Sequence, residues 1–281
     1  MASARVSWLI SFDIAFYFFL MLWRRLKDPW PRRLKRSPIP TATASRAMDS
    51  KITVVIAAVN EAESITAAIG TTRSGSTNVE VIVVDGGSTD QTVATARGAG
   101  AIVLTGSYSS RAACFNAGAA AATGELLVFL HADTLLPCAY GEVVRHALRN
   151  PHISLAAFRL TLTPQMPGLS LVQWGANRRS SMQGLPYGDQ ALCLRRDVFD
   201  HLGGFPQQPL LEDLELVYAA RAAGEICLMP LAVSSSSRRW AKFGVVGNTL
   251  LNQLVLLGRR VGVPPTEMAR WYYGASGRKC Y

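Results

Sequence analysis

From residue 51 onward, short continuous apolar runs alternate with longer stretches that have helical spacing and polar ends. The expected strands are residues 52–57, 79–84, 101–104 and 125–130, and the expected helices are residues 61–69, 90–98 and 111–124. The apolar runs are rich in β-branched residues, which is typical of strands buried on both faces. This alternation predicts βαβ units and an α/β fold with a mostly parallel sheet flanked by helices.

Acidic or amide side chains follow three of these strands. Asn60 and Glu61 come after the first strand, Asp85 after the second and Asp133 after the fourth. A buried carboxylate is costly unless it has a partner. Ligands of parallel sheets bind beyond the carboxyl ends of the strands, so we expect these groups to converge on one ligand. For Asp85 an alternative stays open, because an aspartate before two glycines can simply cap a tight turn.

The motifs of several other enzyme folds are absent from the sequence. The first strand is followed by AAVNEAES, which lacks the G-x-G-x-x-G of dinucleotide-binding enzymes, and neither a P-loop nor a G-x-S-x-G occurs. The nucleotide-binding folds among them bring backbone amides to the ligand. Acidic strand ends instead suit a ribose, whose hydroxyls donate hydrogen bonds, or a diphosphate bridged by a metal ion.

An ordered set of motifs resembles the family 2 inverting glycosyltransferases, which have a Rossmann-like GT-A fold. The motifs are VVIAAVNEAESI at 54–65, VIVVDGGSTDQT at 81–92, VFLHADT at 128–134, PYGDQALCLRRDVFDHLGGFPQQPLLEDLEL at 186–216 and RRWAKFGVVGNTLLNQ at 238–253. The resemblance covers roughly residues 51–273. In detail the motifs are most similar to a small bacterial subfamily linked with arsenosugar or carotenoid glycosylation.

The resemblance implies a division of the chain and a way of holding the donor. Residues 51–135 would form the nucleotide-sugar half and 136–273 the acceptor and catalytic half, between an N-terminal extension at 1–50 and a tail at 274–281. The implied donor is a nucleotide-diphosphate sugar, a UDP-sugar by family. The implied nucleotide-binding residues are Ala57, Asn60, Glu61, Asp85, Gly87, Arg111, Asn116, His131 and Ala132. Among them, Asp85 would bind the base, Glu61 would lie near the ribose, and Arg111 would lie beside the base or the diphosphate.

The family also implies a divalent metal ion, Mn²⁺ or Mg²⁺, at Asp133. Such an ion neutralises the charge that grows on a departing nucleoside diphosphate, and hard oxygen ligands favour these two metals. Many relatives carry an acid at the position of His131, which we expect to pack behind the site rather than to bind metal. No histidine follows Asp213, so the ion would be held largely by the diphosphate.

The second half supplies candidates for the base. Direct displacement at an anomeric carbon needs a base near the attacking hydroxyl, and LLEDLEL at 210–216 offers three acids. The resemblance puts the base at Asp213, with Glu212 beside it. The alternative is that these acids only favour a helix N-terminus through its dipole.

Two further pairs are expected on the acceptor side. Asp189 and Gln190 would form an acceptor-side wall, or else a structural loop. Arg239 and Trp240 resemble the end of the Q-x-x-R-W motif of processive synthases, although Ser236 stands at the glutamine position, and they are expected near the diphosphate and the sugar. Two rival functions stay open, a non-catalytic nucleotide-sugar-binding homologue and a nucleotidyltransferase.

The ends of the chain raise the question of a membrane. Residues 7–23 are apolar apart from Asp13 and precede a basic run at 24–36, so they form either an anchor or upstream sequence that is not part of the working protein. As an anchor they would place the remainder on the cytoplasmic side. Residues 243–260 are apolar with a basic end and predict an interfacial or docking helix, with core packing as the alternative.

Composition narrows the picture further. The formal net charge is +10, but residues 51–281 carry twenty basic against sixteen acidic residues, which suits an anionic ligand. No basic-aromatic module of a nucleic-acid binder occurs, so nucleic acid is not an expected partner. The five cysteines never form a C-x-x-C pair and indicate reduced packing residues. We therefore expect a metal-assisted glycosyltransferase in the cytoplasm or on the cytoplasmic face of a membrane.

Overall fold

The computed structural model describes residues 49–274, so the N-terminal stretch 7–36 and most of the predicted tail lie outside the described residues. Strands β1 to β8 have these bounds: Ile52–Ala58, Val79–Asp85, Ile102–Thr105, Leu126–His131, Thr134–Leu135, Ile153–Thr163, Leu192–Arg195 and Glu225–Ser236. Helices α2 to α11 have these bounds: Ile65–Ser74, Thr92–Gly98, Arg111–Ala121, Tyr140–Leu148, Leu169–Gln183, Arg196–His201, Glu212–Ala223, Arg238–Phe243, Val245–Arg260 and Pro265–Gly274. A short 3-10 helix, η2, spans Gly188–Gln190.

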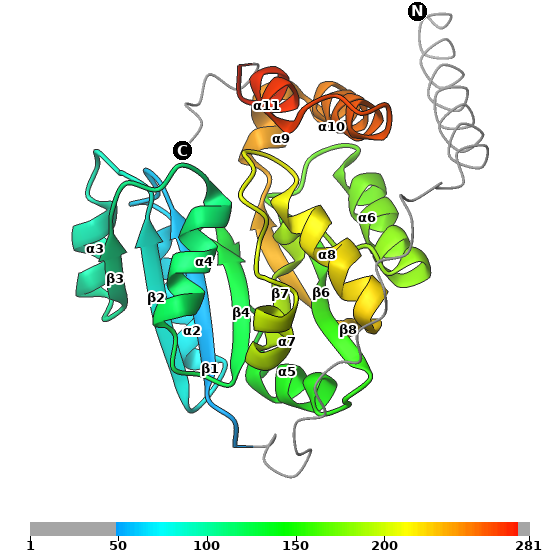
Figure 1. Cartoon of the computed structure of the whole chain (residues 1–281). Helices are drawn as coiled ribbons and strands as arrows, with labels where there is room; N and C mark the ends of the chain where they lie inside the picture. Colours follow the sequence, from blue (N-terminus) through cyan, green and yellow to red (C-terminus); the bar gives the residue numbers. More distant parts are fainter. Residues whose placement is uncertain (1–48, 275–281) are drawn as a thin grey trace, which may run out of the picture. The chain divides into compact units, whose positions relative to one another are not determined.

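The described strands form one sheet in the order β3-β2-β1-β4-β7-β6-β8-β5 (Figure 1). The pairs among β1 to β4 are parallel, as the sequence predicts. Strand β7 then runs antiparallel to both β4 and β6, while β6 and β8 are parallel to each other. The sheet is therefore continuous across the predicted boundary between the two halves, at the pairing of β4 with β7.

The central strands are mainly apolar because both faces of the sheet are covered. Along β1, Ile52, Val54 and Ile56 pack into one core cluster, while Val55 and Ala57 pack into another. The first cluster includes side chains of α2, α3 and α5, and the second includes side chains of α4, α7 and α8. Alternate residues of a strand point to opposite faces, so a strand between two helical layers needs apolar residues on both faces.

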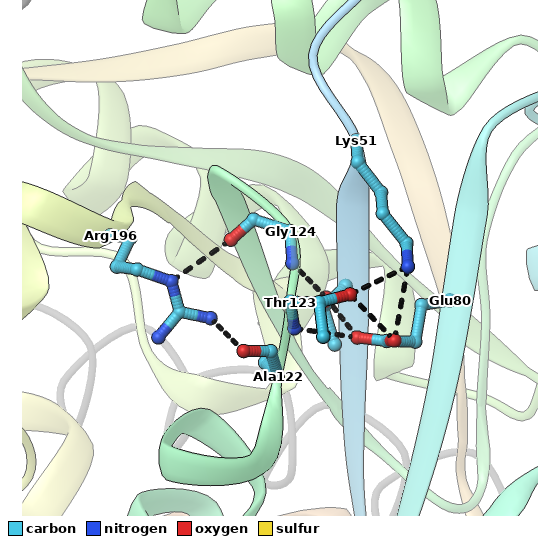
Figure 2. A network of polar contacts seen from close by, with 7 residues as sticks. Lys51, Glu80, Ala122, Thr123, Gly124 and Arg196 are labelled. Carbon is cyan, nitrogen blue, oxygen red and sulfur yellow. Dashed lines mark hydrogen bonds and ion pairs between the residues drawn. The ribbon is translucent and has the colours of Figure 1, made fainter.

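Helix α4 lies very close to the sheet. A Cβ built on Gly118 would come within 2.2 Å of the Cγ1 atom of Val55, so only glycine permits this approach. The helix ends at Ala121, three residues earlier than the sequence predicts, because Arg196 binds the chain there. Its guanidinium donates to the carbonyl oxygens of Ala119, Ala122 and Gly124 at 2.6–3.0 Å, as Figure 2 shows for the last two.

Glu80 joins three segments at the amino-terminal edge of the sheet, away from the predicted site (Figure 2). Its carboxylate pairs with Lys51 at 3.1 Å and accepts hydrogen bonds from the Thr53 and Thr123 hydroxyls and the Thr123 N–H. Burial alone would raise the pKa of Glu80, but these hydrogen bonds outweigh it and lower the pKa to about 2. The network ties β1 and β2 to the turn before β4.

Other predicted element ends also need correction. The helix expected from Glu61 begins at Ile65, because residues 62–64 form a turn. Asp85 is the last residue of β2 and does not follow it. The predicted helix in the apolar segment 243–260 is confirmed as α10. Among residues 49–274, no helix is both long and apolar enough to cross a membrane.

Candidate active site

The carboxyl ends of β1, β2 and β4 meet at the same level of the sheet. In the strand register, Ala58 is opposite Asp85 and Ala57 is opposite His131. Three of the segments that carry predicted donor-side residues are therefore neighbours. Ala57 lies in the buried end of β1, and Ala132 is buried directly after β4.

Asp85 is buried and binds the turn that follows it. Its Oδ2 atom accepts hydrogen bonds from the N–H groups of Gly87 and Ser88 at 3.1 and 3.0 Å, and its Oδ1 atom accepts one from the Ser88 hydroxyl. Gly87 has φ +100°, a conformation that favours glycine. The turn-capping interpretation of Asp85 thus has direct support, and its contact with a base stays a prediction.

Asn60 and Glu61 connect the end of β1 to the same turn. The N–H of Asn60 donates to the Ser88 hydroxyl at 2.9 Å, and its side-chain oxygen accepts from the N–H of Thr89 at 2.8 Å. The N–H of Glu61 donates to the Thr92 hydroxyl at 2.8 Å. These bonds hold the Glu61 carboxylate at the edge of the sheet.

Arg238 bridges two predicted site acids. The same guanidinium nitrogen contacts the Oε1 atom of Glu61 and, at 3.1 Å, the Oδ2 atom of Asp133. The Oε2 atom of Glu61 is buried and, within residues 49–274, has no hydrogen-bond partner. The side chain of Asp133 therefore has a partner, and the site holds an acceptor atom that a ribose hydroxyl would satisfy. Arg238 was not among the site residues predicted from the sequence, although it directly precedes the predicted Arg239.

The protein groups at this edge suit a metal ion only in company with another ligand. Residues 49–274 contain no group of three or more His, Cys, Asp or Glu side chains placed to hold a metal. Asp133 offers one carboxylate, whose hard oxygens match Mn²⁺ or Mg²⁺. The donor set thus fits an ion whose remaining ligands come from a diphosphate and water. Burial and the nearby Arg111 lower the pKa of His131, which keeps its imidazole neutral.

The second half brings its acids to the first turn of α8. Glu212 is 1% exposed, and its Oε1 atom pairs with the Nε atom of Arg111 at 2.5 Å. Burial raises the pKa of Glu212 and Arg111 opposes this effect. Arg111 begins α4, so the pair links α4 to α8 across the two halves. A carboxylate engaged in this way is suited to positioning Arg111 and poorly suited to accepting a proton.

Asp213 is held by backbone groups. Its Oδ2 atom accepts a hydrogen bond from the N–H of Gly188 at 2.7 Å, and its Oδ1 atom accepts one from the N–H of Leu214 at 2.8 Å. A Cβ built on Gly188 would lie 3.0 Å from the Asp213 Oδ2 atom and 3.1 Å from the His131 Nε2 atom. Asp213 and the end of β4 therefore approach the same point, which a side chain at 188 would fill. The Nε2 atom of His131 is buried and has no hydrogen-bond partner in the described part of the chain.

Residues 189 and 190 play different parts in η2. Burial raises the pKa of Asp189 to about 6 against the opposing charge of Arg179, and its buried Oδ1 atom lacks a hydrogen-bond partner within residues 49–274. Gln190 is fully buried, and its amide binds the Phe158 carbonyl, the Ser180 hydroxyl and the Tyr187 N–H. Gln190 thus has a structural role in this loop, whereas acceptor binding by Asp189 stays a prediction.

Arg239 and Trp240 lie on α9, and a tyrosine that the sequence analysis missed joins them. The guanidinium of Arg239 lies 3.6 Å from the centre of the Tyr272 ring, and its Nε atom donates to Asn248 Oδ1 at 2.9 Å. Trp240 packs partly buried against the main core. Burial raises the pKa of Tyr272 and the charge of Arg239 opposes this effect, and the ring contact brings α11 to Arg239. Tyr272 lies beyond the predicted motifs.

The side chain of Asn116 binds the backbone of the loop that contains Phe205. Its side-chain amide donates to the Phe205 carbonyl at 2.8 Å and accepts from the Phe205 N–H at 2.9 Å. Gly204 packs against the same amide, since a Cβ there would lie 2.8 Å from the Asn116 Oδ1 atom. This geometry explains the residue structurally, and nucleotide binding by Asn116 stays a prediction.

Several solved structures resemble the chain in fold. A mannosyltransferase from Pyrobaculum calidifontis, in complex with GDP-Man and Mn²⁺, matches with a TM-score of 0.55 at 20% identity, over 80% of this chain and 65% of that one. Glucosyl-3-phosphoglycerate synthase from Mycobacterium tuberculosis, in complex with Mn²⁺, UDP and phosphoglyceric acid, matches with a TM-score of 0.53 at 19% identity, over 84% and 86%. The chain thus spans just under two thirds of the first protein, and these similarities show that it has the GT-A fold.

The sequence comparisons identify the family. No curated protein matches the sequence significantly. The model described as glycosyl transferase family 2 matches residues 53–200, which is just over half of the chain and includes every predicted donor-side residue. The chain therefore belongs to glycosyl transferase family 2.

Proposed function

We propose that this protein transfers a sugar, with inversion, from a nucleotide-diphosphate sugar to an acceptor hydroxyl. The observation that carries the proposal is the approach of Asp213 to the end of β4 beside Gly188. It sets a carboxylate from the second half against the donor-side edge of the sheet, where Glu61 and Asp133 lie. An inverting displacement needs this arrangement, with a base on one side of the sugar and the diphosphate on the other.

In this proposal the chain's own residues divide the work. Asp213 accepts the proton of the acceptor hydroxyl as its oxygen bonds to the anomeric carbon, and the bond from that carbon to the diphosphate oxygen breaks. The two backbone N–H groups that hold Asp213 fix its direction. Glu212 positions Arg111 toward the donor. When the donor binds, Arg238 releases Asp133, whose carboxylate then faces the diphosphate.

A divalent metal ion, Mn²⁺ or Mg²⁺, would be held by Asp133 and the donor, and when bound it would neutralise negative charge on the leaving diphosphate. Two solved relatives of the fold contain Mn²⁺ together with GDP-Man or UDP. We propose a UDP-sugar as donor. The resemblance to a subfamily linked with arsenosugar or carotenoid glycosylation names two acceptor classes to assay.

Nucleotide binding is tested by thermal shift on the full chain. We would titrate UDP, GDP, CDP and dTDP with and without Mn²⁺, on the wild type and on Asp133→Ala. A ligand that binds only the folded state raises the midpoint with its concentration. We expect UDP to give a Mn²⁺-dependent shift that Asp133→Ala loses. No shift from any nucleotide in a folded protein would contradict the proposal.

Catalysis is tested separately with Asp213→Asn. This variant should keep the nucleotide-dependent shift and lose hydrolysis or transfer of the donor sugar by about 10²-fold or more. Equal turnover in both proteins would remove Asp213 from the role of base. A wild type that shows the shift but no turnover with any donor would favour the non-catalytic nucleotide-sugar-binding alternative. Membership of family 2 speaks against the nucleotidyltransferase.

A further inference from the structure

Helix α10 turns a row of large apolar side chains to solvent. Five of them, 44% to 70% exposed, lie along the helix and at its end: Val246, Leu250, Leu254, Leu257 and Val261. Steps of three or four residues keep side chains on one face of a helix. We call these five residues the α10 stripe.

The opposite face of α10 packs against the rest of the protein. Val255 is buried in a small core cluster with Leu210, Met268 and Ala269, and Gly258 packs against Met268 and Trp271. The helix therefore has a fixed orientation, and its stripe cannot turn inward without breaking this cluster. Core packing, the alternative that the sequence left open, accounts for one face of α10 and not for the stripe.

Helix α6, whose start lies close to the start of α10, also carries exposed apolar side chains. A Cβ built on Gly168, just before α6, would lie 3.3 Å from Val245 at the start of α10, so the two helices begin side by side (Figure 1). Leu171, Trp174 and Met182 on α6 are 43% to 66% exposed. Exposed large apolar side chains on two helices that begin close together favour an interaction site.

Positive charge gathers on the helices that carry the stripe. Residues 238–274, which contain α9 to α11, have six arginines and lysines and one glutamate. Residues 51–237 have twelve basic and fifteen acidic residues. The net positive charge of the described chain therefore lies on α9 to α11, where Arg238, Arg259 and Arg270 form ion pairs with Glu61, Glu215 and Glu267.

We propose that the α10 stripe, with the exposed side chains of α6, docks the protein on an anionic lipid surface. An exposed apolar helix face with basic flanks binds the boundary of a bilayer, where acyl chains take the apolar residues and acidic headgroups attract the cations. A second copy of the chain is a poorer occupant, because its own α9–α11 region carries the same positive charge.

Docking would place the candidate site beside the lipid. Arg239 on α9 contacts Asn248 on α10 and the ring of Tyr272 on α11, so the docking helices are tied to the site. If the proposed glycosyl transfer holds, the acceptor is then a hydroxyl carried by a membrane lipid or another hydrophobic molecule. This consequence rests on the proposed function, whereas the docking itself does not.

The experiment is vesicle flotation with the full chain. Vesicles of phosphatidylcholine alone are compared with vesicles containing phosphatidylglycerol, at low and high salt. The test variants are Leu250→Glu/Leu257→Glu and, to remove apolar area without adding charge, Leu250→Ser/Leu257→Ser. Ile102→Glu is the matched control, since Ile102 on β3 is 52% exposed and lies outside the stripe. Circular dichroism and thermal midpoints verify that each variant folds.

We expect the wild type and Ile102→Glu to float with the anionic vesicles, less so at high salt. Both stripe variants should bind about tenfold more weakly or worse, the glutamate pair most of all. Four results would overturn the proposal. The first is equal flotation of wild type and stripe variants, which would assign binding to residues 1–48. The second is flotation with no preference for anionic vesicles.

The third is a wild-type dimer in light scattering that the stripe variants dissociate without any vesicle binding, which would assign the stripe to a second copy. The fourth is a monomer that binds no vesicles and loses thermal stability in both stripe variants, which would mean that another segment of the chain covers the stripe. Loss of donor turnover in the nucleotide assays would leave the flotation result standing, so the two proposals fail separately.

Discussion

At the scale of single residues, the described acids divide by what surrounds them. Glu212 is buried against Arg111, whereas Glu215 on the same helix pairs with Arg259 at 2.7 Å with both side chains partly exposed. Removing one partner of a buried pair leaves an uncompensated charge, which costs about 3–5 kcal/mol, while an exposed pair contributes about 0–1 kcal/mol. The two glutamates therefore make a matched comparison.

We expect Glu212→Gln to lower the free energy of unfolding by about 3 kcal/mol and Glu215→Gln by less than about 1 kcal/mol. Urea denaturation followed by circular dichroism measures both. Equal effects would show that the Arg111 pair is solvated and that α4 and α8 are joined by apolar packing alone.

Asp189 gives a pH signature of its own. Its pKa is about 6 in the fold, raised by burial from 3.8, so the folded chain binds a proton more tightly than the unfolded chain. The contribution of Asp189 to the free energy of unfolding is therefore fully present below about pH 4 and is lost as the pH rises from about 4 to 6. Asp189→Asn should remove that slope and stabilise the protein above pH 6 by about 2 kcal/mol. A variant no more stable than the wild type at pH 7, measured by urea denaturation, would contradict the burial of this carboxyl group.

At the scale of elements, Glu80 should give the opposite dependence of the free energy of unfolding on pH. Its pKa is lowered from 4.5 to about 2 in the fold, so its contribution is present above pH 4.5 and is lost as pH falls toward 2. Glu80→Gln should therefore lose about 2 kcal/mol at pH 7, and the difference from the wild type should shrink toward pH 2. Denaturation curves at several pH values measure this. An unchanged difference at low pH would mean that the loss comes from packing rather than from the charge.

The elements themselves were largely predictable, and the reason is local. The apolar runs at 52–57 and 79–84 indicate strands between two helical layers. In the structure, every position on β1 and β2 near the site is buried. Element ends were less predictable, because side chains far away in the sequence decide them. Arg196 binds the carbonyls where α4 ends, and no pattern within 111–124 contains that information.

The same contrast holds for the site. Glu61 and Asp133 were found because strand ends of a parallel sheet share an edge. Arg238 and Tyr272 were missed because their contacts depend on how β8 and the last helices return to that edge, and no local spacing encodes this return. Gln190 and Asn116 show that a polar residue inside a family motif can also serve the loop that contains it.

At the scale of the whole molecule, the two predicted halves share one sheet and are expected to unfold together. Residues 126–129 of β4 pair with 192–195 of β7, and Arg196 from the second half binds carbonyls of the first. Three of the six tryptophans lie in the second half and three in residues 1–50, whereas residues 51–135 contain none. Tryptophan fluorescence therefore carries no signal from the donor half, whereas far-UV circular dichroism reports on both halves.

Coincident urea midpoints by these two probes are therefore the expected result, since a cooperative unit loses all its structure in one transition. Arg196→Ala should move both midpoints down together, because its bonds bridge the halves. A fluorescence midpoint at a lower urea concentration than the circular dichroism midpoint would mean that the β4–β7 pairing is weak. The catalytic half could then open away from the donor half, and the approach of Asp213 to β4 would depend on a bound donor to hold it.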